Sequence, residues 1–225
     1  MCFKVWEEIT IPTYSKHARY GVRAGQPNPR FLDAKLFEEM VLGPYREAKF
    51  EPHTGAFLFE FQRHGMSADE FCTRLDQFFL RLPRDFPYAV EVRNPDLLGV
   101  PYLQVLSRHG VAHVYNHWSA MPSLTAQHIR MQGFTARFTV LRLLTPLGMS
   151  YAAAKKQAEP YTKIVEELPQ MRREAVQLMR QAVGAGRRTY VLVNNRAEGN
   201  APLTVHGLVK MLQGYEPNES EVLRH

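Results

Sequence analysis

Several features that mark specialised proteins are missing from this chain. Its 225 residues include only two cysteines, Cys2 and Cys72, too few for a disulfide framework and typical of a protein from the reducing cytoplasm. No apolar run approaches the roughly 20 residues that a membrane-spanning helix needs. The N-terminus also lacks the basic start and long apolar stretch of a signal peptide. We therefore expect a cytoplasmic protein without a membrane partner.

Motifs that would name a reaction are also absent. The chain has no glycine-rich dinucleotide or phosphate-loop pattern, no Gly-x-Ser-x-Gly elbow and no convincing Cys–His pair. His109, His113 and His117 have the spacing of metal ligands on a helix, but we expect a strand there, which scatters them. Only His113 is then expected to face the interior. The sequence predicts no metal site and no cofactor.

The charge of the chain is moderately positive. The formal net charge is +6, and 22% of the residues are charged, close to the average for globular proteins. A basic balance favours anionic partners. No Lys/Arg-rich run of the kind found in nucleic-acid-binding tails is present, so ordinary solubility is the simpler explanation.

Short apolar runs alternate with longer amphipathic segments along the whole chain. The apolar runs predict six strands: Cys2–Val5, Ala56–Gln62, Ala89–Arg93, Val111–Asn116, Thr139–Leu144 and Tyr190–Asn195. The segments between them predict helices at Phe31–Ala48, Ala68–Leu82, Pro95–Arg108, Ser123–Met131 and Pro202–Gln213, with two or three further helical pieces in Ser150–Val183.

This alternation predicts a parallel sheet with helices outside it. Polar residues follow many different strands, which favours a TIM-type (β/α) barrel, because a barrel gathers the ends of its strands at one mouth. An open doubly wound sheet is the alternative. We expect residues 1–225 to form a single barrel domain.

Side chains alternate along a strand, so each predicted strand has two faces. The three phenylalanines of Phe57–Gln62 share one face and belong against the helices. The opposite faces of this and three other strands carry charged or amide groups. The side chains expected to face the interior are Lys4, Glu60, Gln62, Glu91, Arg93 and Arg142.

The ionic members of this set comprise three positive and two negative charges. Burying an unpaired ion costs several kcal/mol, so one positive charge remains to be neutralised, and an anionic ligand would do so. Arginine suits a carboxylate or phosphate. We therefore predict Glu60, Glu91 and Arg93 to be catalytic, with the glutamates as acid and base. A structural ion-pair network without a ligand is the alternative.

Polar side chains at strand ends complete the predicted site. The residues expected to bind the ligand are Lys4, Gln62, Asn116, His117, Arg142, Asn194, Asn195 and Asn200. The stretch Gly199–Pro202 begins a helix in a late βα loop, where barrels often bind phosphate through backbone N–H groups. An ordinary turn and helix start explains this stretch equally well.

A family resemblance rests on short motifs that occur in order along most of the chain. These are Phe3–Val5 with Ile9 and Thr10, Val90–Arg93, Val140–Arg142 with Tyr151 and Tyr161, and Val193–Asn195 with Gly199–Ala201. Together they resemble the YecE-like family, also called domain of unknown function seventy-two. The resemblance implies a TIM-type barrel, and it implies no particular activity.

The start of the chain departs from this family pattern. Family members usually begin with two further βα units, whereas Phe3–Val5 matches what looks like their third strand. A full barrel has eight strands in about 250 residues. We therefore expect an incomplete barrel of about six βα units, in which the first two are absent.

Three hypotheses about function follow. The first is an enzyme-like site that binds or acts on a small anionic ligand, a phosphate or a carboxylate. The second is a nucleic-acid-binding or nuclease-like barrel. The basic charge supports this hypothesis, although no motif does. The third is an inactive, truncated remnant.

Overall fold

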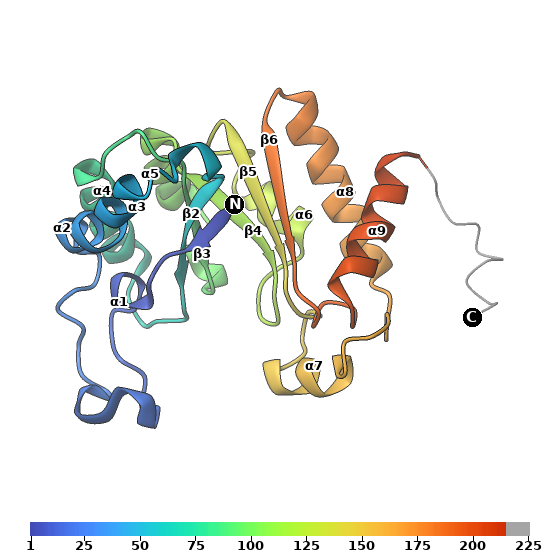
Figure 1. Ribbon diagram of the computed structural model, residues 1–225, viewed down its shortest axis with the longest axis horizontal. Helices are drawn as coiled ribbons and strands as arrows, with labels where there is room; N and C mark the ends of the chain where they lie inside the picture. Colours follow the sequence, from blue (N-terminus) through green and yellow to red (C-terminus); the bar gives the residue numbers. More distant parts are fainter. Residues whose placement is uncertain (215–225) are drawn as a thin grey trace. The chain divides into compact units, whose positions relative to one another are not determined.

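The computed structural model describes residues 1–214, which contain six strands in one sheet (Figure 1). Neighbouring strands follow one another in chain order, and the three pairs from β1 to β4 are parallel. This is the strand order of a (β/α) barrel, whereas the order of a doubly wound sheet reverses at a switch point. The strands are β1 (Cys2–Lys4), β2 (Ala56–Phe61), β3 (Tyr88–Val92), β4 (Ala112–His117), β5 (Phe138–Leu143) and β6 (Arg188–Val193).

The predicted fold class is therefore confirmed: residues 1–214 form an incomplete α/β barrel with six of the usual eight strands. All six predicted strands are present, and their ends lie within two residues of the predicted ones. Continuous apolar runs thus located the strands well, and β2, β3 and β4 are buried on both faces.

The helical segments also follow most of the predictions. Ser123–Met131 and Pro202–Gln213 are confirmed as helices with slightly shifted ends, and Ser150–Val183 contains two helices. The α-helices are α1 (Glu7–Thr10), α2 (Ala34–Phe37), α3 (Gly43–Glu47), α4 (Ala68–Arg81), α5 (Val100–His109), α6 (Leu124–Arg130), α7 (Tyr151–Ala158), α8 (Pro169–Gly184) and α9 (Ala201–Leu212). The 3-10 segments are η1 (Ala18–Arg23), η3 (Glu51–His53) and η4 (Pro95–Leu97), and η2 (Glu38–Leu42) is a π-helix.

The prediction of one helix over Phe31–Ala48 was wrong at its start and in its middle. Leu32 has a positive φ of 56°, and the helix begins only after Asp33, whose side chain accepts a hydrogen bond from the backbone N–H of Leu36. The π-helix η2 then separates α2 from α3. The apolar spacing indicated a helix correctly but could not locate the cap or the π turn.

The predicted helix Pro95–Arg108 is also divided. Pro95 opens the 3-10 segment η4, and the backbone is extended at Leu98 and Gly99 before α5 begins at Val100. A second proline, Pro101, occupies the first turn of α5. Backbone N–H groups have no partner within the helix at this position, so proline loses no hydrogen bond there.

The chain divides into two compact units. The first unit comprises Met1–Val114 and His128–Thr139. The second comprises residues 115–127 and the residues from 140 onward. The strands β4 and β5 each contribute residues to both units.

An aromatic cluster forms the core of the first unit. Phe59 in β2 is fully buried, and its ring centroid lies 5.1 Å from that of Phe37 and 5.3 Å from that of Phe78. Phe57 and Phe61 extend from the same strand face toward the same helices, as the alternation predicted. Figure 1 shows α2, α4 and α5 grouped beside β2 and β3.

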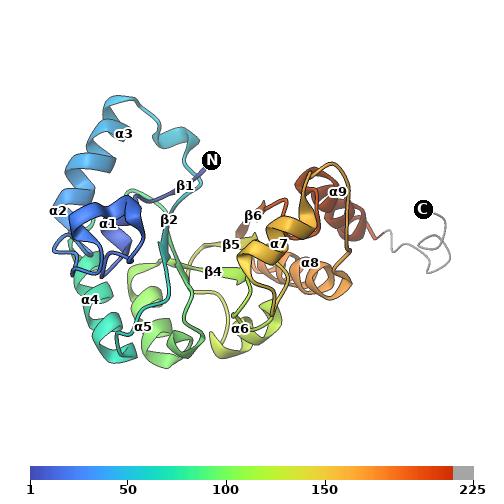
Figure 2. The same ribbon diagram turned by 90° about the horizontal axis from the view of Figure 1, so that it is seen from below.

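In the second unit, α8 and α9 pack beside β6 (Figure 2). The buried face of α8 includes Met171, Ala175, Leu178 and Ala182. Arg172 on the same helix forms a buried ion pair with Glu198, with 2.8 Å between Nη2 and Oε2. A Cβ atom at Gly207 in α9 would lie 3.0 Å from Arg172 Nη1, so the glycine lets α9 approach this guanidinium closely. Within residues 1–214, no helix is long and apolar enough to cross a membrane.

We predict that Phe59→Ala lowers the free energy of unfolding by about 3–5 kcal/mol, because it leaves a cavity among aromatic side chains. Chemical denaturation measures this loss. Leu80→Ala is the matched control, since Leu80 is 69% exposed and its truncation is expected to cost less than about 0.5 kcal/mol. Equal losses for both variants would contradict the assignment of Phe59 to the core.

Candidate functional site

Ionic side chains meet at the carboxyl ends of the first three strands. Glu60 in β2 and Glu91 in β3 are register partners on neighbouring parallel strands. Arg93 bridges them, because its Nη2 lies 2.7 Å from Glu91 Oε1 and 3.5 Å from Glu60 Oε2. Lys4 at the end of β1 places its Nζ 3.1 Å from Glu60 Oε1, and Gln62 Nε2 donates to the same oxygen over 2.6 Å. The structure thus brings together all five predicted site residues of the first unit.

Burial makes this cluster energetically demanding. The side chains of Glu91, Arg93 and Glu60 are 0%, 5% and 6% exposed, whereas that of Lys4 is 52% exposed. Like charges directly opposite one another on a sheet are destabilising, so the two glutamates require cations between them. The two cations Lys4 and Arg93 balance the two carboxylates. The excess positive charge predicted for the interior is therefore not a property of this cluster.

Lys4 connects the cluster to a cleft of about 910 Å³ that is lined entirely by residues of the first unit. This volume lies within the usual range for ligand sites, roughly 300–1,000 Å³. The lining includes strand-end residues such as Lys4, Gln62, Arg63 and His64, and residues of the segment after β1 such as Glu7, Lys16 and Arg19. Four of the lining side chains are basic and two are acidic: Lys4, Lys16, Arg19 and Arg63 against Glu7 and Glu70.

The segment after β1 forms one wall of the cleft. It carries two Glu–Arg–Tyr triads, which we name the inner and the outer triad. In the inner triad, Glu8 accepts a hydrogen bond from the Tyr14 hydroxyl and pairs with Arg23 over 3.1 Å. The Arg23 guanidinium stacks 4.6 Å from the centroid of the Tyr14 ring. Burial, followed by the Glu8 carboxylate, raises the pKa of Tyr14. In Figure 1 this segment extends beyond α1.

The outer triad has the same plan and uses the preceding glutamate. Glu7 pairs with Arg19 over 2.8 Å and accepts a hydrogen bond of 3.1 Å from the Tyr20 hydroxyl. The Arg19 guanidinium stacks 4.6 Å from the centroid of the Tyr20 ring. All three outer residues line the cleft, whereas only Tyr14 of the inner triad does. The sequence reasoning missed both triads, because their members lie in a segment without helix or strand periodicity.

His64 is a further cleft residue that the sequence analysis missed. Asn94 holds its backbone on both sides: His64 N–H donates to Asn94 Oδ1 over 3.1 Å, and Asn94 Nδ2 donates to the His64 carbonyl over 3.0 Å. The imidazole lies against the Phe71 ring, with 5.0 Å between centroids. Burial lowers the pKa of His64 below its ordinary value, so the ring is neutral near pH 7.

The prediction that His113 faces the interior was wrong. Its Nδ1 lies 3.3 Å from the Tyr102 hydroxyl of α5, and the two rings meet edge to face at 5.8 Å. It therefore points toward the helix layer. His109 instead places Nε2 2.7 Å from an oxygen of Asp76. Residues 1–214 contain no group of three or more His, Cys, Asp or Glu side chains arranged to hold a metal ion.

The predicted amides of the second unit have structural partners. Asn200 caps α9, since its Oδ1 accepts from Leu203 N–H over 3.0 Å and its Nδ2 donates to the Tyr161 carbonyl over 2.7 Å. Asn195 Oδ1 accepts from Ala201 N–H over 2.8 Å, and Asn194 Oδ1 accepts from Arg196 N–H over 3.0 Å. These contacts occupy donors of the first turn of α9, which favours the turn-and-helix-start interpretation of Gly199–Pro202.

The remaining predicted ligand-binding residues also lie in the second unit. His117 Nδ1 donates to the Thr145 carbonyl over 2.9 Å, and burial lowers its pKa. The Gln127 side chain bonds to the backbone N–H and C=O groups of Asn116, over 3.2 and 2.7 Å. Arg142 is half-buried in β5. The assignment of these residues, and of the three amides, to one site with Glu91 and Arg93 stays a prediction.

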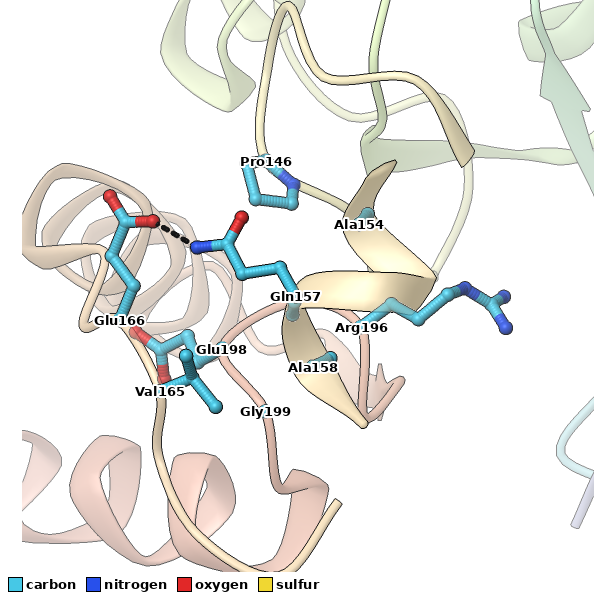
Figure 3. Close-up of a pocket in the computed structure, with 10 residues that line it drawn as sticks. Pro146, Ala154, Gln157, Ala158, Val165, Glu166, Arg196, Glu198 and Gly199 are labelled. Carbon is cyan, nitrogen blue, oxygen red and sulfur yellow. Dashed lines mark hydrogen bonds between the residues drawn. The ribbon is translucent and has the colours of Figure 1, made fainter. Parts of the chain in front are cut away.

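The second unit contains a pocket that is too small for a metabolite. It lies between α7 and the loop after β6, where Gln157 Nε2 donates to Glu166 Oε2 over 2.6 Å (Figure 3). Its volume is about 10 Å³, roughly the space of one water molecule. The cleft of the first unit is therefore the better candidate site.

The fold and the strand-end cluster define a protein of the (β/α) barrel class. The family model for "Protein of unknown function DUF72" matches residues 1–223, and the chain belongs to this family. The resemblance inferred from the short motifs is thereby confirmed. No curated protein matches the chain.

Two solved structures of DUF72 family proteins share the fold. The protein from Thermotoga maritima is 17% identical, with a TM-score of 0.57, and the match covers 94% of this chain and 73% of that one. The protein from Enterococcus faecalis is 15% identical, with a TM-score of 0.58, and the match covers 95% of this chain and 77% of that one. At these identities the likeness shows the fold alone.

We predict that Arg93→Met lowers the free energy of unfolding by about 3–5 kcal/mol, because Glu60 and Glu91 would remain buried without the guanidinium between them. Arg74→Met is the control, since the Arg74–Glu70 pair is about half exposed on both sides and contributes at most about 1 kcal/mol. Urea denaturation compares the two. Similar losses would contradict a demanding buried cluster.

We also predict that His64 makes stability depend on pH. Its folded pKa lies below the ordinary value of 6.5, so the unfolded chain binds more protons between these two values. Stability is therefore full above pH 6.5 and falls as the pH decreases from 6.5 toward the folded pKa. Denaturation across this window should show a shallower fall for His64→Gln than for the wild type. His206→Gln, at an exposed position, is the control and should leave the slope unchanged.

Proposed function

We propose that the cleft of the first unit binds a small anionic ligand through a phosphate or carboxylate group. The observation that carries this proposal is the excess of basic over acidic side chains around a cleft of ligand size, four against two. These side chains come from both the strand ends and the segment after β1, so a ligand would meet cations on two walls. A positive cleft with low-dielectric walls also attracts anions from solution.

Lys4 is the residue that connects the buried cluster to the ligand in this proposal. Its ammonium group has three N–H donors, and one suffices for Glu60 at 3.1 Å. The side chain is half-exposed and lines the cleft, so further donors can serve a ligand. Glu60 and Gln62 then fix the position of the ammonium group before the ligand arrives, which lowers the entropy cost of binding.

A role in proton transfer falls to Glu60 rather than Glu91 within this proposal. Glu60 contacts Lys4 and Gln62, two residues that line the cleft, whereas Glu91 contacts Arg93 and is fully buried. A general acid or base must come within hydrogen-bonding reach of the reacting group, directly or through one water, and Glu60 lies one contact away from the cleft. Arg93 is then a positioning residue that holds both carboxylates.

Thermal unfolding with added inorganic phosphate tests the proposal. A ligand present at a concentration of one hundred times its Kd stabilises the native state by about 2.7 kcal/mol. The melting temperature should therefore rise with the concentration of phosphate. Lys4→Gln should reduce this rise. Lys35→Gln removes one positive charge at an exposed position away from the cleft and should leave the rise unchanged.

An unchanged melting temperature with phosphate and with a panel of anionic metabolites would contradict the proposal. If Lys4→Gln and Lys35→Gln reduce the rise in melting temperature equally, net charge rather than the cleft causes the effect. If an oligonucleotide binds instead, its affinity should fall strongly with salt, because phosphate contacts release counterions. If Lys4→Gln leaves that affinity unchanged, the result would favour a nucleic-acid partner.

A further inference from the structure

The outer triad differs from the inner one in a way that bears on ligand choice. Both have the same contacts, but the inner Glu8 side chain is 6% exposed, whereas Glu7 is 36% exposed and its partner Arg19 is 57% exposed. Glu8 is further fixed by Arg30, 3.9 Å away, and by Asn28, which donates to the Glu8 carbonyl over 2.7 Å. The inner triad thus holds the wall together, and the outer triad faces the cleft.

We propose that Glu7 is an exchangeable counter-ion for Arg19, which a phosphoryl group displaces, and that the cleft binds phosphate monoesters in preference to carboxylates. This inference rests on the proposed function and adds a substrate class to it. Glu7, Arg19 and Lys16 would be the specificity-determining residues, and all three line the cleft.

The geometry makes the exchange inexpensive. Ion pairs between exposed side chains contribute little to stability, because solvent screens both charges. Arg19 keeps two other contacts when Glu7 leaves: its Nη2 donates to the Tyr20 hydroxyl over 2.5 Å, and its guanidinium stacks on the Tyr20 ring. The guanidinium is therefore positioned for an incoming anion without Glu7.

The charge of the ligand decides whether it can compete. A carboxylate would replace Glu7 with a group of the same charge and the same two acceptor oxygens, so this exchange gains little. A phosphate monoester carries close to two negative charges near neutral pH and has three acceptor oxygens. It can therefore bind the Arg19 fork in a bidentate manner and still reach a second cation such as Lys16.

Isothermal titration calorimetry of the full chain with methyl phosphate and with acetate tests this inference, because the two probes are similar in size and differ in charge. We expect the wild type to bind methyl phosphate at least about tenfold more tightly than acetate, a factor that one charge-assisted hydrogen bond accounts for. Glu7→Gln should strengthen the binding of both probes, and that of methyl phosphate at least as much as that of acetate, because it removes a competing carboxylate whose repulsion is greater for the more highly charged ligand. Arg19→Gln should weaken methyl phosphate binding by about tenfold.

Glu39→Gln is the matched control, since it removes one exposed carboxylate that pairs with Lys35 outside the cleft. It should leave both dissociation constants at their wild-type values. Glu7→Asp keeps the charge at position 7 and serves as a second variant if Glu7→Gln folds poorly; it should preserve the discrimination.

Two outcomes overturn the inference in different ways. If methyl phosphate binds but Glu7→Gln does not strengthen its binding, Glu7 is not an exchangeable counter-ion, and the proposed anion site survives without it. If neither probe binds the wild type, the proposed function itself fails, and the inference fails with it.

Discussion

Two carboxylates on neighbouring strands impose the central constraint on this protein. Glu60 and Glu91 are register partners at the carboxyl ends of β2 and β3, and both are buried. Parallel pairing of these strands places them side by side, so the fold requires cations at the same height. Arg93 follows β3 directly, and Lys4 ends β1, so the same strand geometry supplies both. Sheet register and charge balance therefore depend on each other.

The constraint also explains why the candidate site lies where it does. A buried cluster whose charges balance has no need of a ligand, but its outermost member, Lys4, reaches the cleft. The other cations of the cleft come from Arg63 after β2 and from Lys16 and Arg19 in the segment after β1. The inner triad around Glu8 holds this segment in place. The strand ends and the segment after β1 thus both place positively charged side chains around the same cleft.

Continuous apolar runs predicted the strands, and the alternation of side chains along them predicted the cluster. Alternation placed Phe57, Phe59 and Phe61 against helices, and it placed Glu60 and Glu91 on the opposite face. It failed where side chains act outside regular elements. The apolar spacing that began before Asp33 concealed its role as a helix cap. The position of His64 beside Phe71 and the two triads depend on side-chain contacts that no helix or strand periodicity records.

The most direct test of the account follows the Lys4 ammonium group itself. Nuclear magnetic resonance of lysine-labelled protein, with the resonance assigned through Lys4→Gln, reports on this group while methyl phosphate is added. The account predicts a saturable shift of the Lys4 signal with the dissociation constant of the whole protein. Binding of methyl phosphate that leaves the Lys4 signal unmoved would contradict the claim that the strand-end cluster forms the floor of the anion site.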